Sequence, residues 1–137
     1  MGGLRWLDSM SVGRSEFDND HQAVIAALAA IRTAIEAGEV GEAHQLVIRL
    51  MTLADDHILR EEAFLRRIGF PGIEPVIKAQ KDSLSKIAAL ADLIQAEPGK
   101  AATVIFSLEQ AFVSYLLRAD INFKSYVEAA GLRDVDD

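Results

Sequence analysis

The sequence contains no cysteine, no long apolar run and very little histidine. Without cysteine the chain has no disulfide, no thiolate metal ligand and no cysteine nucleophile. No stretch reaches the roughly 18 consecutive apolar residues that a membrane-spanning helix needs. The opening MGGLRWLDSM has a single arginine and no apolar segment of the signal-peptide type. From these absences we expect a soluble, cytoplasmic protein without a membrane partner.

Basic residues are also scarce, since 14 Lys and Arg stand against 21 Asp and Glu, for a formal net charge of −7. Nucleic-acid binding relies on positive charge that neutralises phosphates, so we do not expect a nucleic-acid partner. Hydrophobic residues, by contrast, make up 50% of the 137 positions. This length and composition predict one domain, residues 1–137, whose hydrophobic core needs no cross-links.

Hydrophobic residues recur with the period of an α-helix, and no alternating β-branched run competes with that pattern. We predict an irregular N-terminal arm at 1–18, followed by helices at about 19–37, 40–68, 74–95 and 100–130. Asp18 or Asn19 would cap the first helix, and Gly69 followed by Pro71 would end the second. Long amphipathic helices with short connections predict an all-α fold, an antiparallel up-and-down four-helix bundle preceded by the arm.

Two features of the predicted bundle concern packing alone. Arg32 and Glu109 lie close to the inner faces of their helices, where we expect them to pair with each other. The fourth helix should bury an apolar face made of Ala102, Ile105, Phe106, Val113, Leu116 and Leu117.

Polar residues also fall on the faces expected to point into the bundle. They are His21, His57, Glu61, Gln80 and Asp120. His57 and Glu61 are four residues apart, so they share one helix face with the apolar residues Leu50 and Phe64. A polar group buried in that way needs a partner, and helix bundles also place metals between facing helices.

The residues alone leave two interpretations of this inward set open. Two imidazoles and two carboxylates from three helices suit a borderline divalent metal such as iron or zinc. The same groups would also satisfy one another as a buried histidine–carboxylate network without an ion. Either arrangement avoids an unpaired buried charge, which would cost several kcal/mol.

Motifs along most of the chain resemble those of the hemerythrin family, in particular the bacterial single-domain bacteriohemerythrins. The segment WLDSMSVGRSEFDNDHQAVI resembles the start of that family, and HILREE resembles its HxxxE helix. RRIGFPGIEPVIKAQKDSL resembles the region between its second and third helices, and YLLRADINFKSYV its closing segment. The resemblance covers about residues 4–130 and rests on the combination of these motifs.

The resemblance implies a bundle whose centre, in the family, holds two irons that bind dioxygen reversibly. One iron takes a histidine from the first helix and one from the second. The other takes an HxxxH pair from the third helix and a histidine from the fourth, and a Glu and an Asp bridge the two irons. Carried onto this chain, His21 and His57 match the terminal ligands of one iron, whereas Glu61 and Asp120 match the bridging carboxylates.

The ligands of the other iron are missing from this sequence. Val76 and Gln80 stand where the family has its HxxxH pair, and Tyr115 stands where it has the fourth-helix histidine. No histidine follows His57, so no shift of register restores the missing three. The resemblance therefore implies a site that has lost one of the two irons and holds a single non-haem iron. Zinc or manganese would also suit its ligands. Its expected metal ligands are His21, His57, Glu61 and Asp120.

Tyr115 and Gln80 are expected beside this ion. Tyr115 would be a fifth ligand or a nearby hydrogen-bond donor, and Gln80 would hydrogen-bond a bound water or a freed carboxylate oxygen. The expected function is binding or sensing of dioxygen or another small diatomic ligand, and not standard di-iron oxygen carriage.

No nucleophile–base pair stands out in the sequence, so we do not expect an enzyme, although weak oxidative activity at a single iron stays open. The alternative function is that of a metal-free bundle, which kept the scaffold and serves as a binding or signalling module. The sequence indicates no particular protein partner.

Overall fold

A computed structural model describes residues 6–7, 11–119 and 124–132, although not the side chains of residues 113–119. Helices account for most of this part of the chain, and it contains no strand. The long helices are α1 (Ser15–Glu36), α2 (Val40–Arg67), α3 (Ile73–Ala96) and α4 (Ala101–Ala119). Two short helices complete the set, η2 (Pro98–Lys100) and α5 (Ser125–Ala129).

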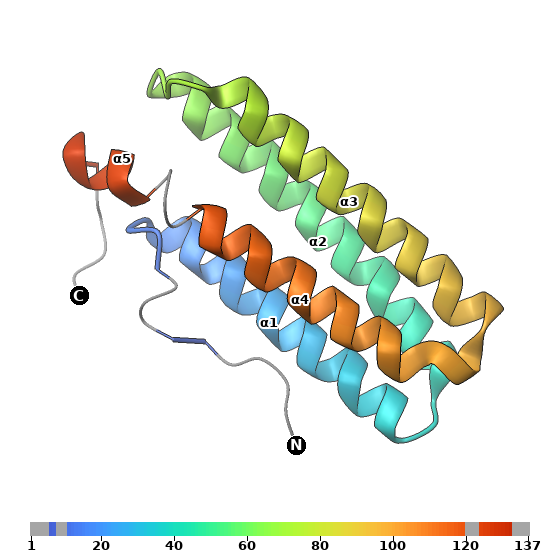
Figure 1. The fold of residues 1–137 in the computed structure, drawn as a ribbon. Coiled ribbons are helices and arrows are strands. Elements are labelled where there is room, and N and C mark those ends of the chain that lie inside the picture. Colours follow the sequence, from blue (N-terminus) through green and yellow to red (C-terminus); the bar gives the residue numbers. More distant parts are fainter. Residues whose placement is uncertain (1–5, 8–10, 120–123, 133–137) are drawn as a thin grey trace.

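The four long helices form a bundle. In Figure 1, α1 to α4 lie side by side, and each runs antiparallel to the one before it in the chain. Contacts join α1 to α2, α2 to α3, α3 to α4, and α4 back to α1. The expected all-α four-helix bundle with an N-terminal arm is therefore confirmed.

The end of α2 follows from its glycine. Gly69 has a φ of +69°, a backbone conformation that residues with a side chain rarely adopt. This lets the Gly69 N–H donate to the Arg66 carbonyl and the Phe70 N–H donate to the Leu65 carbonyl. The pair of hydrogen bonds satisfies the last carbonyls of the helix and turns the chain toward α3.

The start of α1 differs from the prediction. The helix begins at Ser15, with Arg14 at its N-cap, whereas we expected a start near residue 19 capped by Asp18 or Asn19. Asp18 is instead buried in the first turn, where its carboxylate accepts hydrogen bonds from Ser11 Oγ (2.5 Å) and from the Val12 N–H (2.8 Å). The cap-type side chain therefore anchors the preceding arm, because the arm's own polar groups are buried there and need an acceptor.

The fourth predicted helix, 100–130, is described as α4 and α5, and its described buried face agrees with the prediction at Ile105 but not at Ala102 or Phe106. Val104, Ile105 and Leu108 are buried, whereas Phe106 is 58% exposed and Ala102 is also exposed. Apolar residues lie on more than one side of α4, so the sequence pattern did not fix which side packs inward. The predicted inward side chains of residues 113, 116 and 117 lie outside the described part.

Arg32 and Glu109 pair across the bundle, as expected. Arg32 Nε donates to Glu109 Oε2 over 3.0 Å, and Arg32 Nη2 donates to Glu109 Oε1. This bidentate ion pair joins α1 to α4 and explains how Glu109 is buried although it carries a charge.

The interior divides into two apolar clusters along the bundle. The larger one lies toward the α1–α2 and α3–α4 connections, and it includes Leu28, Ile31, Val47, Leu50, Ile94, Ile105 and Leu108. The smaller one lies at the opposite end, where the N-terminal arm and α5 meet the helices, and it consists of Val12, Phe17, Phe64, Leu65 and Val127. Between the two clusters, α1 and α2 carry the buried polar residues His21, His57 and Glu61 beside the apolar Ile58.

Ile31 provides a direct test of the packing of the larger cluster, because its side chain has an exposed fraction of 0%. We expect Ile31→Ala to lower the free energy of unfolding by about 2–5 kcal/mol, through lost burial and the cavity left behind. Ile48 is 41% exposed, so the matched change Ile48→Ala should cost less than about 1 kcal/mol. Urea unfolding followed by circular dichroism measures both. Equal losses in the two variants would contradict the packing described.

Candidate metal site

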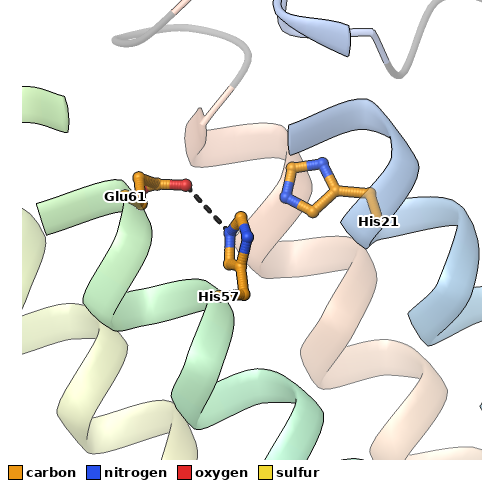
Figure 2. A group of neighbouring side chains, drawn as sticks. All are labelled: His21, His57 and Glu61. Carbon is orange, nitrogen blue, oxygen red and sulfur yellow. Dashed lines mark ion pairs between the residues drawn. The ribbon is translucent and has the colours of Figure 1, made fainter. Parts of the chain in front are cut away.

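The polar residues between the two clusters come from α1 and α2. His21 lies one turn after Phe17 on α1, and its side chain is buried, with an exposed fraction of 1%. His57 and Glu61 lie on α2, one turn apart, and both are buried. Figure 2 shows the three side chains gathered in the space between the helices, with the two imidazole rings next to each other. Their potential ligand atoms all lie within 4.8 Å of one another.

The two rings of His57 and His21 pack edge to face, with their centroids 4.9 Å apart. Phe17 borders His57 at 5.7 Å between centroids, and Phe112 borders His21 at 6.1 Å. These aromatic neighbours exclude water from the cluster on two sides. The imidazoles are therefore held in an apolar surrounding, in which interactions between polar groups are strengthened.

His57 contacts a carboxylate with each of its ring nitrogens. Its Nε2 lies 2.9 Å from Glu61 Oε2, and its Nδ1 lies 2.8 Å from Asp20 Oδ2. Burial acts to lower the pKa of His57, but the hydrogen bonds and charges of Glu61 and Asp20 outweigh it, so the pKa lies above the ordinary value of 6.5. An ion bound at Nε2 would have to compete with this preference for a proton.

His21 has the opposite electrostatic character. Burial, together with the nearby charge of His57, lowers the pKa of His21 from 6.5 to about 3, against a smaller opposing effect of Asp20. The ring is therefore neutral at physiological pH. A neutral imidazole keeps a lone pair on one nitrogen, which is the form that binds metals.

Gln80 on α3 completes the contacts of Glu61. Gln80 is buried, with an exposed fraction of 1%, and its Nε2 donates a hydrogen bond to Glu61 Oε1 over 2.6 Å. One Glu61 oxygen thus faces His57 and the other accepts from the amide. From the sequence we predicted that Gln80 would hydrogen-bond either a bound water or a carboxylate oxygen, and the structure shows the second contact.

The remaining predicted residues are placed less completely. Val76 on α3 is half-buried and packs against the smaller apolar cluster. Tyr115 lies on α4, but its side chain is outside the described part, as is the whole of Asp120. The structure therefore brings His21, His57, Glu61 and Gln80 together and leaves the contribution of the fourth helix undescribed.

Sequence reasoning missed Asp20 and Arg60. Asp20 precedes His21 on α1, and Arg60 follows His57 by three residues on α2, so each lies beside an inward histidine. Arg60 Nη1 donates to Asp20 Oδ2 over 2.6 Å, and Arg60 Nη2 donates to Asp20 Oδ1 over 2.9 Å. Burial acts to raise the pKa of Asp20, but Arg60 and His57 outweigh it, and the pKa lies below the ordinary 3.8. The adjacency to histidines was a usable signal, but the contact itself depends on how two helices pack.

A cavity of about 70 Å³ adjoins the cluster. His21, His57 and Gln80 line part of it, and much of the remaining wall is apolar, including Leu28 and Leu50 from the larger cluster. One water molecule occupies about 30 Å³ of the liquid, so this space has room for a molecule of diatomic size. The cavity is a mainly apolar chamber next to the imidazoles.

The donor set fits a borderline divalent cation. Imidazole nitrogen and carboxylate oxygen are the ligand types of non-haem iron and zinc sites. Within the described residues, His21, His57 and Glu61 are the group whose ligand atoms approach closely enough to share one ion. Three protein donors leave further coordination positions for other ligands. The residues present therefore fit a bound metal.

A four-helix bundle with a histidine–glutamate cluster at its centre defines a class of small cation-binding domains. This chain belongs to the hemerythrin family: the family model described as the hemerythrin HHE cation-binding domain matches residues 12–118. The resemblance inferred from the motifs is thereby confirmed, and it places the chain among metal-binding proteins. Searches of curated proteins and of solved structures gave no match.

No helix in the described part of the chain combines the length and the apolar composition that crossing a membrane requires.

Proposed function

We propose that this hemerythrin-family chain binds a single non-haem iron and uses it to bind or sense dioxygen or another small diatomic ligand. His21, His57 and Glu61 would hold the ion together with Asp120, and Tyr115 would stand beside it. The family's usual second iron would be absent. Zinc or manganese would suit the same donors, and family membership is the reason for preferring iron.

The observation that carries the single-ion proposal is the contact between Gln80 and Glu61. In the family the carboxylate corresponding to Glu61 bridges two irons, so each of its oxygens faces a metal. Here Gln80 donates to Oε1 over 2.6 Å, and this amide therefore takes the position of a partner on that side. Val76, at the other expected histidine position of α3, packs among apolar residues. Both facts favour one ion, held at the His21 and His57 side.

The ligand proposal rests on the cavity. A single non-haem iron with open coordination positions would supply a binding site for a diatomic molecule, whereas the family's two-iron oxygen carriage needs an electron from each iron. His21 and His57 line the same chamber, so an ion held by them would border a space of about 70 Å³ with largely apolar walls. Such walls exclude water and suit a small apolar ligand. Binding, and not catalysis, is the activity that these features support.

A metal-free bundle is the second candidate, and one observation favours it. The polar atoms of His57 and Glu61 have partners within the protein: Asp20 and Glu61 face the ring nitrogens of His57, and Gln80 donates to Glu61. A buried network satisfied in this way is compatible with a scaffold that has lost its metal. Function would then lie on the outer surface.

Metal content decides between the two candidates. The protein is purified without chelators, stripped, reloaded with ferrous ion under anaerobic conditions, and analysed for iron per chain. We expect a value near one, because Gln80 donates to the Glu61 oxygen that a second iron would need. A value near two would restore the standard family site, and a value near zero would support the metal-free bundle. Nitric oxide, added to the reloaded protein as a spectroscopic probe, then tests for an open coordination position through a change in visible absorption.

A further inference from the structure

Asp20 links two helices through the contact that it makes with His57. Asp20 is adjacent to His21 on α1, and successive residues on a helix point about 100° apart. While His21 points into the bundle, the Asp20 carboxylate reaches sideways to α2, where Oδ2 lies 2.8 Å from His57 Nδ1. The same short stretch of α1 therefore supplies one candidate ligand and a partner for the other.

Arg60 holds the Asp20 carboxylate from the solvent side. Its two terminal nitrogens contact both carboxylate oxygens, at 2.6 and 2.9 Å. Two parallel hydrogen bonds from a planar guanidinium fix the orientation of a carboxylate better than a single contact does. The side chains become steadily less exposed inward, from 42% for Arg60 to 13% for Asp20 and 6% for His57. An exposed arginine is thus connected to a buried imidazole.

The contact decides which nitrogen of His57 faces the centre of the cluster. A histidine ring can present either nitrogen, and a hydrogen bond at one of them determines which one a metal can use. Because Nδ1 faces Asp20, Nε2 is the nitrogen that faces Glu61, at 2.9 Å. Carboxylate partners of this kind are a recurring means of orienting metal-binding histidines.

We propose that Asp20, held by Arg60, is a positioning residue that sets the ring orientation of His57 and thereby raises the affinity of the cluster for a divalent metal. This inference rests on the proposed function, since it assumes that His57 binds the ion through Nε2. It adds two residues, Asp20 and Arg60, that the sequence analysis did not assign to the site. Neither residue would touch the ion.

The test compares the affinity for Zn²⁺ of the full chain and of three variants, by competition with a chromophoric chelator. Asp20→Asn keeps the size of the side chain but weakens the acceptor at Nδ1, and we expect a loss of affinity of about 10- to 100-fold. Arg60→Gln keeps the Asp20 carboxylate but removes its bidentate contact with the guanidinium, so we expect a smaller loss of affinity. The matched control is Glu16→Gln, which removes the same unit of charge 3.8 Å from Arg60 Nη1. It should bind Zn²⁺ within about twofold of the unchanged chain.

A second measurement separates positioning from general structural support. In the zinc-loaded protein, with histidine labelled by ¹⁵N, the Nδ1–H of His57 should give a low-field proton signal that exchanges slowly. Asp20→Asn should shift that signal to higher field and speed its exchange, whereas Glu16→Gln should leave it in place. A residue that merely stabilised the fold would change the unfolding midpoint without moving this resonance.

The outcomes distinguish this inference from the proposed function. If the unchanged chain binds Zn²⁺ and Asp20→Asn binds it equally well, Asp20 does not position His57, although the metal site stands. If Asp20→Asn and Glu16→Gln lost equal affinity for Zn²⁺, the loss would be due to the removed charge alone, and the inference would also be overturned. If the unchanged chain binds no Zn²⁺, the metal site itself fails and the inference with it. Should Asp20→Asn fail to fold, Arg60→Gln decides, and unchanged affinity in that variant overturns the inference.

Discussion

Replacing His57 by alanine is expected to remove the bound metal. His57 is the residue on which the cluster converges, because its ring lies 4.9 Å from that of His21 and its Nε2 lies 2.9 Å from Glu61. Metal content should fall from near one ion per chain to less than about a tenth of an ion. Binding at about 1,000 times the Kd stabilises the folded state by about 4 kcal/mol. That metal-dependent gain in the free energy of unfolding should disappear in the variant.

The chain offers a matched control for this experiment in His44. This histidine lies on the same helix, α2, but outside the group of close ligand atoms. His44→Ala should keep both the metal content and the metal-dependent stabilisation. The two variants and the unchanged chain are compared by metal analysis and by urea unfolding, each with and without metal. If His57→Ala retained a full complement of metal, the assignment of His57 as a ligand would be wrong.

Introducing the three missing histidines is expected to raise the metal content from one ion to two. The change is Val76→His, Gln80→His and Tyr115→His together, at the positions that the family resemblance identifies. Replacing Gln80 also removes the amide that donates to Glu61 Oε1, which frees that oxygen for a second ion. Metal analysis and the visible spectrum of the iron-loaded protein would report the gain. An added metal site of three histidines and a shared carboxylate has the donor types that non-haem iron prefers.

Asparagine at the same three positions provides the control. The triple asparagine variant disturbs the packing of α3 and α4 to a similar extent but adds no imidazole, so its metal content should not exceed one ion. Circular dichroism establishes that both triple variants remain folded. A triple histidine variant that folds and still binds a single ion would contradict the correspondence of Val76, Gln80 and Tyr115 with the family's ligands.

Much of the fold was predictable because it depends on local pattern. The helical spacing of apolar residues gave four helices, and the glycine and proline signals near residue 70 marked the end of α2. The errors arose where one side chain had two possible partners. Asp18 was assigned to a helix cap but binds the arm, and Phe106 was assigned to the core but is 58% exposed. Local propensity cannot decide such cases, because the competing partner or face is supplied by distant parts of the chain.

The candidate site was predictable to a different degree on each helix. The spacing of His57 and Glu61 placed both on one face, and the structure brings His21 to them. The sequence predicted that Gln80 points inward. Its hydrogen bond to Glu61 Oε1 could not be predicted, because it depends on how α2 and α3 are aligned along the bundle. The ion pair of Asp20 and Arg60 was not predicted, because it joins residues 40 positions apart in the sequence. The parts of the site on the fourth helix, Tyr115 and Asp120, stay predictions.

The sequence by itself determined which ligands this protein can offer a metal. It places a histidine and a glutamate four residues apart, and it contains no histidine beyond His57, so a second set of three histidines is excluded in any fold. The tertiary structure alone decided which of these polar groups contact one another. It set Asp20 against Nδ1 of His57 and Gln80 against Glu61, because helix packing fixes distances between side chains that the sequence leaves far apart.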